Sequence, residues 1–314
     1  ITPISKDASG DRLAETLESS HVTLSGGRVD APTTIARVTV TDGIPSYDFE
    51  RDGTAERAVT QDTLRAAIPN DTKVLHTGSL AVSEGADGAA WEATCSEAYA
   101  AGTVVSFDPN VRLSVIADPA SYRDRVFRML TKTTLLKLSD EDLEGLYPDL
   151  DQADALSKVR SLTSAPLVVM TKGPDGASAL YHGGSITIPA PRVPDLVDTV
   201  GAGDTFMATL IAGLVRIDAV TTDRIARLSA DDVETLLRRA GMAAAINCGR
   251  AGCNPPHASG TGRRAYRVIK APSGVLSHRH AALVLARQGP TVPKGSATTA
   301  SGCHKRRRQP DVTL

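Results

Sequence analysis

Short apolar runs alternate with amphipathic segments through the middle of the chain. The run at 166–170 is fully apolar, which is typical of a strand buried in a parallel sheet. The hydrophobic spacing predicts further strands at 73–76, 103–107 and 134–138, and helices at 84–101, 118–131 and 151–162. This alternation predicts an α/β protein with a mostly parallel sheet.

The first 60 residues of the chain have a different pattern. Residues 5–24 have the spacing of a helix. Residues 33–40 and 47–51 alternate in the manner of strands, and Asp42-Gly43 between them is a strong turn signal. We therefore expect a hairpin here, which is either a plain edge hairpin or part of a site.

The stretch 198–206 reads Asp-Thr-Val-Gly-Ala-Gly-Asp-Thr-Phe and leads into apolar residues at helical spacing up to position 215. A glycine-rich turn at the start of a helix presents backbone N–H groups and partial positive charge, which suits an anion such as phosphate. Asp204 can stabilise the first turn of the helix or accept a proton from a hydroxyl group. Taken alone, such a stretch is more often an ordinary turn with a favourable acid.

Polar residues follow each predicted strand, at 77–79, 108–112, 139–142 and 171–176. Ligands of open parallel sheets bind beyond the carboxyl ends of the strands. Each of these loops also has an ordinary explanation as a turn or a helix cap. Together they predict a binding site along one edge of the sheet.

The net charge of −1 conceals an uneven distribution along the chain. Residues 257–314 contain 11 Lys and Arg residues and one acidic residue, and the rest of the chain has an excess of acids. We therefore expect a folded domain over 1–256 and a basic, disordered tail over 257–314. A basic run is more often a solvated chain end than a nucleic-acid-binding arm, so no nucleic-acid partner is expected.

The pattern of the cysteines favours a reducing compartment. Cys95, Cys248, Cys253 and Cys303 lack the spacing of a disulfide framework or a zinc site, so free buried thiols are expected. No apolar run approaches the ~20 residues of a membrane span, and the first residues do not form a signal peptide. We therefore predict a cytoplasmic protein with no membrane partner.

The nine residues 198–206 closely resemble the C-terminal signature of the PfkB, or ribokinase-like, family of carbohydrate kinases, and the four strand-end loops follow in the family's order. The resemblance implies a three-layer α/β/α sandwich with a mostly parallel sheet and a small β-lid within residues 30–58. It implies ATP-dependent phosphorylation of a sugar hydroxyl, with Mg²⁺ as a cofactor and K⁺ as a further candidate. The hairpin region resembles the fructokinase branch, and 2-keto-3-deoxygluconate and ribose are the alternative sugars. A homodimer through the lid is a further expectation.

The same resemblance assigns roles to individual residues. Asp204 is the catalytic base, and the amides of Gly201, Ala202 and Gly203 form an anion hole. The residues assigned to the nucleotide and its phosphates are Lys137, Ser139, Thr171, Gly173, Gly176 and Asn247. The residues assigned to the sugar are Phe49, Arg51, Ser79, Arg112 and Asp204. Asp142 is assigned to Mg²⁺ through the phosphates, and Asp198 and the Val200 carbonyl are assigned to a monovalent cation.

The chain departs from the family pattern in three places. Asp142 stands where the family usually has Glu, and its side chain is one methylene shorter. The family's N-terminal strand and the GGxxxN segment after it have no counterpart, so we expect a truncated domain with an open sheet edge and little or no activity. The tail resembles nothing in the family. The alternative class is therefore a catalytically impaired fragment that binds nucleotide without turnover.

Overall fold

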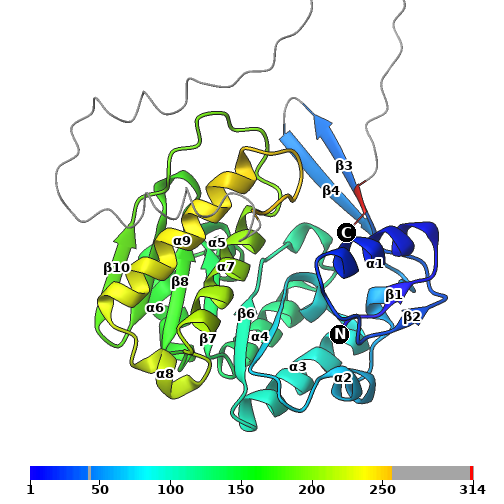
Figure 1. Cartoon of the computed structure of the whole chain (residues 1–314), viewed down its shortest axis with the longest axis horizontal. Coiled ribbons are helices and arrows are strands. Elements are labelled where there is room, and N and C mark those ends of the chain that lie inside the picture. Colours follow the sequence, from blue (N-terminus) through cyan, green and yellow to red (C-terminus); the bar gives the residue numbers. More distant parts are fainter. Residues whose placement is uncertain (42–43, 257–311, 314) are drawn as a thin grey trace, which may run out of the picture. The chain divides into compact units, whose positions relative to one another are not determined.

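The computed structural model describes residues 1–41, 44–256 and 312–313 of the 314-residue chain (Figure 1). The chain divides into two units, of which the first contains Ile1–Pro255 and Asp311–Leu314. All elements described below belong to this first unit. Cys303 and nearly all of the predicted basic tail lie outside the described residues.

A six-stranded sheet in the order β10-β9-β8-β7-β6-β5 forms the centre of this unit. Neighbouring strands from β5 to β8 are parallel, and β9 and β10 continue the sheet in antiparallel pairing. The strands are β5 (Val74–Gly78), β6 (Val104–Asp108), β7 (Leu135–Ser139), β8 (Leu167–Thr171), β9 (Ala177–Tyr181) and β10 (Gly184–Ile188). The four strands predicted from the hydrophobic pattern are confirmed, each shifted by one or two residues.

Helices cover both faces of the sheet. The bounds are α3 (Gly85–Ala100), α4 (Pro119–Leu130), α5 (Asp140–Leu146) and α6 (Gln152–Leu162) for one layer, and α7 (Ala202–Arg216), α8 (Thr222–Ala226) and α9 (Ala230–Cys248) for the other. Strand side chains alternate between the layers, so Leu136 packs in the first core and Leu135 in the second. Figure 1 shows α7 and α9 lying side by side over the second face. The predicted three-layer α/β/α arrangement is therefore confirmed.

The N-terminal segment is arranged differently from the expected long helix. Ile4–Ser5 (β1) pairs in parallel with Arg28–Val29 (β2), and α1 spans only Ala8–Ser19. The helix begins at Ala8 because the carboxylate of Asp7 caps it, accepting the N–H of Gly10 at 2.7 Å. The helix predicted over 5–24 was therefore too long at both ends.

The predicted hairpin is confirmed as β3 (Ile35–Thr41) and β4 (Ile44–Glu50), with Ile35 opposite Glu50. β11 (Val312–Thr313) adds to β3 in antiparallel pairing. The chain then reaches the main sheet through η1 (Ala55–Arg57) and α2 (Gln61–Ala67), and the remaining 3₁₀ turns are η2 (Ser79–Val82), η3 (Leu113–Val115) and η4 (Gly173–Asp175). The short helices α2 and α8 were not predicted, because five to seven residues show too little periodicity.

Candidate active site

The signature stretch forms the turn that starts α7. Gly201 is the N-cap residue in the left-handed conformation (φ 73°), and no side chain caps the helix. The N–H of Ala202 donates to the carbonyl of Thr199 at 3.2 Å, and the N–H of Thr205 donates to Gly201 at 2.8 Å. Asp204 lies exposed in the first turn. An uncapped helix N-terminus with a glycine turn can accept an anion, as the sequence predicted.

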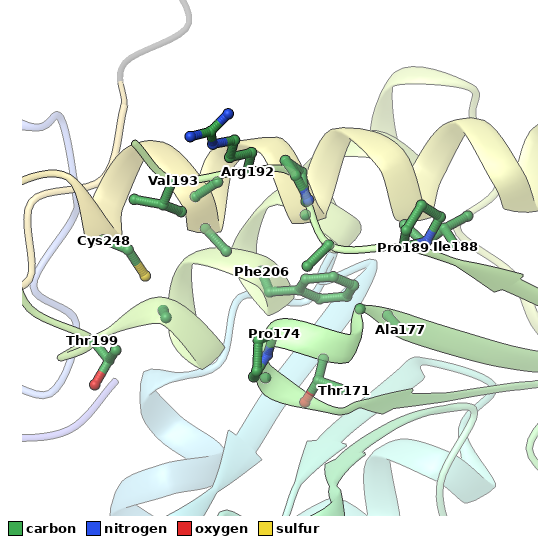
Figure 2. Close-up of a pocket in the computed structure, with 18 of the residues that line it drawn as sticks. Thr171, Pro174, Ala177, Ile188, Pro189, Arg192, Val193, Thr199, Phe206 and Cys248 are labelled. Carbon is green, nitrogen blue, oxygen red and sulfur yellow. The ribbon is translucent and has the colours of Figure 1, made fainter. Parts of the chain in front are cut away.

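A pocket of about 590 Å³ lies beside this helix N-terminus (Figure 2). Its walls come from the end of β8, from η4, from the segment after β10, and from α7 and α9. Figure 2 shows the Phe206 ring in the middle of the lining residues, between α9 and the loop of Pro174. The predicted site residues among the lining are Thr171, Gly173, Gly176, Ala202 and Gly203. The structure thus brings three predicted nucleotide residues together with two residues of the predicted anion hole.

A buried ion pair lies beneath the same turn. Nζ of Lys137 is 2.7 Å from Oδ2 of Asp108, and the two side chains are only 4% and 6% exposed. A Cβ atom built on Gly203 would lie 3.2 Å from this Nζ, so the glycine lets the ammonium approach the helix N-terminus. Oδ1 of Asp108 is buried and has no hydrogen-bond partner. Lys137 was predicted, whereas Asp108 was missed although it belongs to the predicted 108–112 loop.

The electrostatics of Asp108 follow from this burial. Burial raises the pKa of Asp108 to about 6, while the charge and hydrogen bond of Lys137 lower it, and the charges of Asp142 and Asp204 raise it further. Three carboxylates and one ammonium therefore share one region of the molecule. A buried carboxyl group with a raised pKa among several charged side chains is typical of a functional site.

Ser139 and Asp142 form a capping box at the start of α5. Oγ of Ser139 accepts the N–H of Asp142 at 3.1 Å, and Oδ2 of Asp142 accepts the N–H of Ser139 at 2.7 Å. Oδ1 of Asp142 accepts the N–H of Val111 at 2.6 Å, so the carboxylate also holds the 108–112 loop. Both Asp142 oxygens therefore have backbone partners in this structure.

The loops after β5 and β6 are joined to each other. Ser79 has a positive φ of 51°, its N–H donates to the carbonyl of Pro109 at 3.1 Å, and its Oγ accepts Nδ2 of Asn110 at 3.2 Å. Nη1 of Arg112 donates to the carbonyl of Val111 at 2.9 Å. The two residues predicted to contact the sugar, Ser79 and Arg112, thus lie on one connected pair of loops.

His76 is a second residue that the sequence analysis missed. It lies on β5, its ring is accessible, and its Nδ1 is 3.0 Å from Oγ of Ser106. Protein surrounding the ring lowers the pKa of His76, while the charge of Asp204 acts in the opposite direction. A strand-interior histidine carries no sequence signal of its own, which is why it was not found.

Phe49 and Arg51, predicted to face the sugar, line a separate hollow of about 430 Å³ at the base of the hairpin. Arg51 is buried and each of its nitrogens has a partner. Nε lies 2.7 Å from Glu56, Nη1 donates to Oγ of Ser83 at 2.8 Å, and Nη2 donates to the carbonyl of Leu80 at 2.9 Å. The structure therefore places Arg51 as a support that ties the hairpin to η2.

Asn247, predicted to contact the nucleotide, is fully buried behind the signature turn. Its Nδ2 donates to the carbonyl of Val200 at 2.7 Å, and its Oδ1 accepts the N–H of Asn254 at 2.8 Å. Both ends of the side-chain amide are used, so Asn247 supports the turn in this structure. Asp198 has a similar place, because its carboxylate accepts the N–H groups of Val200 at 2.5 Å and Gly252 at 2.8 Å.

Two expectations about metals and thiols can be compared with the structure. Within the described residues, no group of three or more His, Cys, Asp or Glu side chains could hold a metal ion. Cys95, Cys248 and Cys253 are free, but only Cys95 is buried and Cys253 is exposed. The expectation of uniformly buried thiols was therefore wrong, because Cys253 lies in a surface loop after α9.

No helix in the described part of the chain is long and apolar enough to cross a membrane.

Residues 1–259 match the family described as pfkB family carbohydrate kinase. The chain belongs to this family. It is 39% identical over 231 residues to "Fructokinase" of Rhizobium leguminosarum bv. trifolii, a match that covers 73% of this chain and 69% of that protein. The predicted family and its carbohydrate kinase activity class are therefore confirmed.

Two solved structures resemble the fold of this PfkB kinase. A fructokinase from Xylella fastidiosa with bound ATP has a TM-score of 0.72 at 23% identity and covers 81% of this chain and 79% of its own. A fructokinase double mutant from Vibrio cholerae O395 with bound fructose, ADP and potassium ion has a TM-score of 0.69 at 23% identity, with coverages of 81% and 79%. At this identity the likeness shows the fold, and it confirms the predicted ribokinase-like sandwich.

Proposed function

We propose that this protein is a fructokinase-like enzyme, which transfers the γ-phosphoryl group of ATP to a hydroxyl group of fructose. The observation that carries the proposal is the uncapped N-terminus of α7, with Asp204 in its first turn and Gly203 in the wall of the 590 Å³ pocket. The Rhizobium fructokinase supports fructose as the sugar, and the Xylella structure supports ATP as the phosphoryl donor.

In this proposal Asp204 is the general base. Its exposed carboxylate accepts the proton of the attacking sugar hydroxyl as the new P–O bond forms. The N–H groups of Gly201, Ala202 and Gly203 donate to the oxygens of the transferring phosphoryl group, where negative charge is greatest. Because the Ala202 N–H already donates to Thr199 at 3.2 Å, that long bond must be exchanged for one to the phosphoryl group.

Lys137 neutralises the phosphates from below the turn. Its ammonium lies near Gly203 and is paired with the buried carboxylate of Asp108. Thr171, Gly173 and Gly176 line the nucleotide side of the pocket, and Ser139 fixes the α5 terminus nearby. Positioning and charge stabilisation supply most of the catalysis of phosphoryl transfer.

Mg²⁺ neutralises charge on the phosphates when it is bound. The lack of a three-residue acidic cluster among the described residues fits an ion held mainly by phosphate oxygens and water. Asp108 has a free carboxylate oxygen, and both oxygens of Asp142 accept backbone N–H groups. Asp142 and Asp108 would therefore help to hold the ion, whose charge would offset that of the phosphates.

Further features of the proposal rest on the family resemblance. 2-Keto-3-deoxygluconate and ribose are the alternative sugars, and the alternative class is a fragment that binds nucleotide without turnover. The sugar side would use Phe49, Ser79 and Arg112. A homodimer through the β3–β4 lid and a cytoplasmic location stay predictions.

The experiment that tests this proposal measures ADP formation in a coupled assay with fructose, ribose and 2-keto-3-deoxygluconate, beside nucleotide binding by calorimetry. We expect ADP formation that is fastest with fructose. Turnover with another sugar only would replace fructose. Nucleotide binding without turnover on any sugar would support the impaired fragment, and the absence of both would refute the proposal.

A further inference from the structure

The pocket beside the α7 N-terminus is lined mainly by apolar side chains and glycines. Among its lining residues that the structure describes, the polar side chains are those of Thr171, Arg192, Thr199 and Cys248, and none is a carboxylate, a carboxamide or an imidazole. A protein distinguishes closely related ligands most strongly through hydrogen bonds to their polar groups. The side chains of this pocket therefore offer little with which to distinguish one purine base from another.

Two of the polar side chains lie at the phosphate end of the pocket. Figure 2 shows Thr199 and Cys248 on the signature-turn side of the Phe206 ring, and Ile188 and Pro189 on the opposite side of that ring. A nucleotide with its phosphates at the α7 N-terminus extends its base toward this opposite side. The base therefore meets the apolar end of the pocket.

The other two polar side chains are directed elsewhere. The guanidinium of Arg192 points away from the Phe206 ring in Figure 2, and the residue is exposed. Oγ1 of Thr171, at the end of β8, donates to the carbonyl of Leu138 at 3.5 Å. Neither group is placed to select a base at the apolar end.

Backbone groups add few donors at this end. Gly241, Ala244 and Ala245 belong to α9, whose interior N–H and C=O groups bond along the helix. Pro189 and Pro191, in the segment after β10, have no N–H group. The backbone of these walls therefore resembles the side chains in having little hydrogen-bonding capacity for a base.

Gly241 closes the apolar end of the pocket. A Cβ atom built on it would lie 3.5 Å from Cδ of Pro191 and 3.8 Å from Cδ1 of Ile188, which are ordinary van der Waals separations. All three residues line the pocket. A longer side chain at position 241 would have to extend into the pocket, because these neighbours already lie at contact distance.

The rim of the pocket is open to water. Gly173, Pro174, Pro189 and Leu196 line the pocket and are exposed. A flat base can cover its faces with the apolar walls while its polar edge stays hydrated, so no polar group is buried without a partner. Adenine, guanine and hypoxanthine then gain similar free energy, because their ring faces have nearly the same area.

We propose that this site accepts purine nucleoside triphosphates irrespective of the base, so that GTP and ITP serve as phosphoryl donors beside ATP. The inference rests on the proposed function, because it concerns the nucleotide whose phosphates bind at the α7 N-terminus. In each case the bond between the γ-phosphorus and the β,γ-bridging oxygen breaks as the bond to the sugar oxygen forms. Asp204 takes the proton of the sugar hydroxyl, and the nucleoside diphosphate leaves with the bridging oxygen.

The first measurement compares the β,γ-imido analogues of ATP and GTP, each with Mg²⁺, by calorimetry on the wild-type chain. We expect dissociation constants within about tenfold of each other, because the pocket has few hydrogen bonds with which to select a base. Formation of fructose phosphate with ATP, GTP and ITP should give kcat/KM values in the same range. A preference of more than about tenfold for the ATP analogue would overturn the inference.

The second measurement uses Gly241→Leu, which places a side chain where the base should lie. We expect the affinities for both analogues to fall about tenfold or more, by similar factors, because the base loses apolar contact area. Inorganic tripolyphosphate with Mg²⁺ should bind the variant and the wild type alike, since the phosphate end is unchanged. Thr235→Leu, at an exposed position of α9, is the matched control and should behave as wild type.

The outcomes separate this inference from the proposed function. Binding and turnover with ATP alone would overturn the inference while the proposed function stands. Similar binding of both analogues without turnover would support the inference and, for the function, the fragment that binds nucleotide. Binding of neither analogue would refute both.

The variant gives an independent decision. Unchanged affinity for both analogues in Gly241→Leu would show that the base lies elsewhere, and this would overturn the inference. If Gly241→Leu does not fold, the ratio of the two wild-type affinities decides.

Discussion

Lys137 near α7 and Arg51 at the base of the lid are both buried cations, but their surroundings differ. Lys137 has one carboxylate partner, Asp108, whose second oxygen has no partner at all. Arg51 donates from all three of its nitrogens, to Glu56, Ser83 and Leu80. Buried polar groups are normally satisfied, and the exceptions cluster at functional sites. Near α7, one oxygen of Asp108 therefore stays available to a ligand. At the base of the lid, all three nitrogens of Arg51 are already bonded to protein groups.

We expect the largest effect on the α7 side from replacing Asp204, which should lower the turnover. If Asp204 is the base, Asp204→Asn lowers kcat by about 10²–10⁴-fold, because the sugar hydroxyl loses its proton acceptor. Nucleotide affinity should stay near that of wild type, as the N–H groups of the turn are unchanged. ADP formation and calorimetry measure the two effects. Asp223→Asn, exposed on α8, is the control, and wild-type turnover in Asp204→Asn would refute the assignment.

Lys137→Met should give the next largest effect, on stability as well as on binding. The change leaves Asp108 buried without its counter-charge, which costs about 3–5 kcal/mol in the free energy of unfolding at pH 7. Urea unfolding followed by the fluorescence of Trp91, the single tryptophan, measures this cost. Lys158→Met on the exposed face of α6 is the control. A cost below about 1 kcal/mol would show that the ion pair is not needed for folding.

Arg51→Met should destabilise the lid side by less, about 1.5–3 kcal/mol, because its main charged partner Glu56 is partly exposed and can be hydrated. We expect the loss in the unfolding free energy, with the affinity of nucleotide unchanged. Arg12→Met on α1 is the exposed control. A loss of sugar affinity without a loss of stability would instead support the predicted role of Arg51 in binding the sugar.

The smallest effect concerns the pH dependence of stability, and it has opposite signs for Asp108, which pairs with Lys137, and for Asp7, which caps α1. Burial raises the pKa of Asp108 to about 6, so the folded state binds more protons, and this residue's contribution to stability falls as pH rises from about 4 to 6. Hydrogen bonds from Thr33 and Gly10 lower the pKa of Asp7, so its contribution is present above about pH 4 and is lost as pH falls below it.

Urea unfolding between pH 3.5 and 7 tests this pair of signs. Asp108→Asn should flatten the decline between about pH 4 and 6, and Asp7→Asn should flatten the loss on the acid side. Asp223→Asn should leave the profile unchanged. The same change of slope in both variants would contradict the assigned signs.

The sequence by itself determined the elements with strong periodicity. The apolar run at 166–170 and the spacing after Asp204 gave β8 and α7, and the polar loops after the strands gave the edge where the site lies. These features could be predicted because hydrophobic spacing and turn chemistry act over a few residues. The nine-residue signature also sufficed to find the family, since it combines a fixed turn with a fixed acid.

Tertiary structure decided which polar residues meet. Asp108 and Lys137 are 29 positions apart and pair only because β6 and β7 are neighbours in the sheet. Asn247 and Val200 are 47 positions apart, and the packing of α9 beside α7 brings the side-chain amide of Asn247 to the carbonyl of Val200. Arg51 shows the same limit, because its partners Leu80 on η2 and Ser83 directly after it could not be inferred from local spacing. Local sequence patterns determine where the helices and strands form. The packing of these elements against one another determines which polar and charged side chains meet.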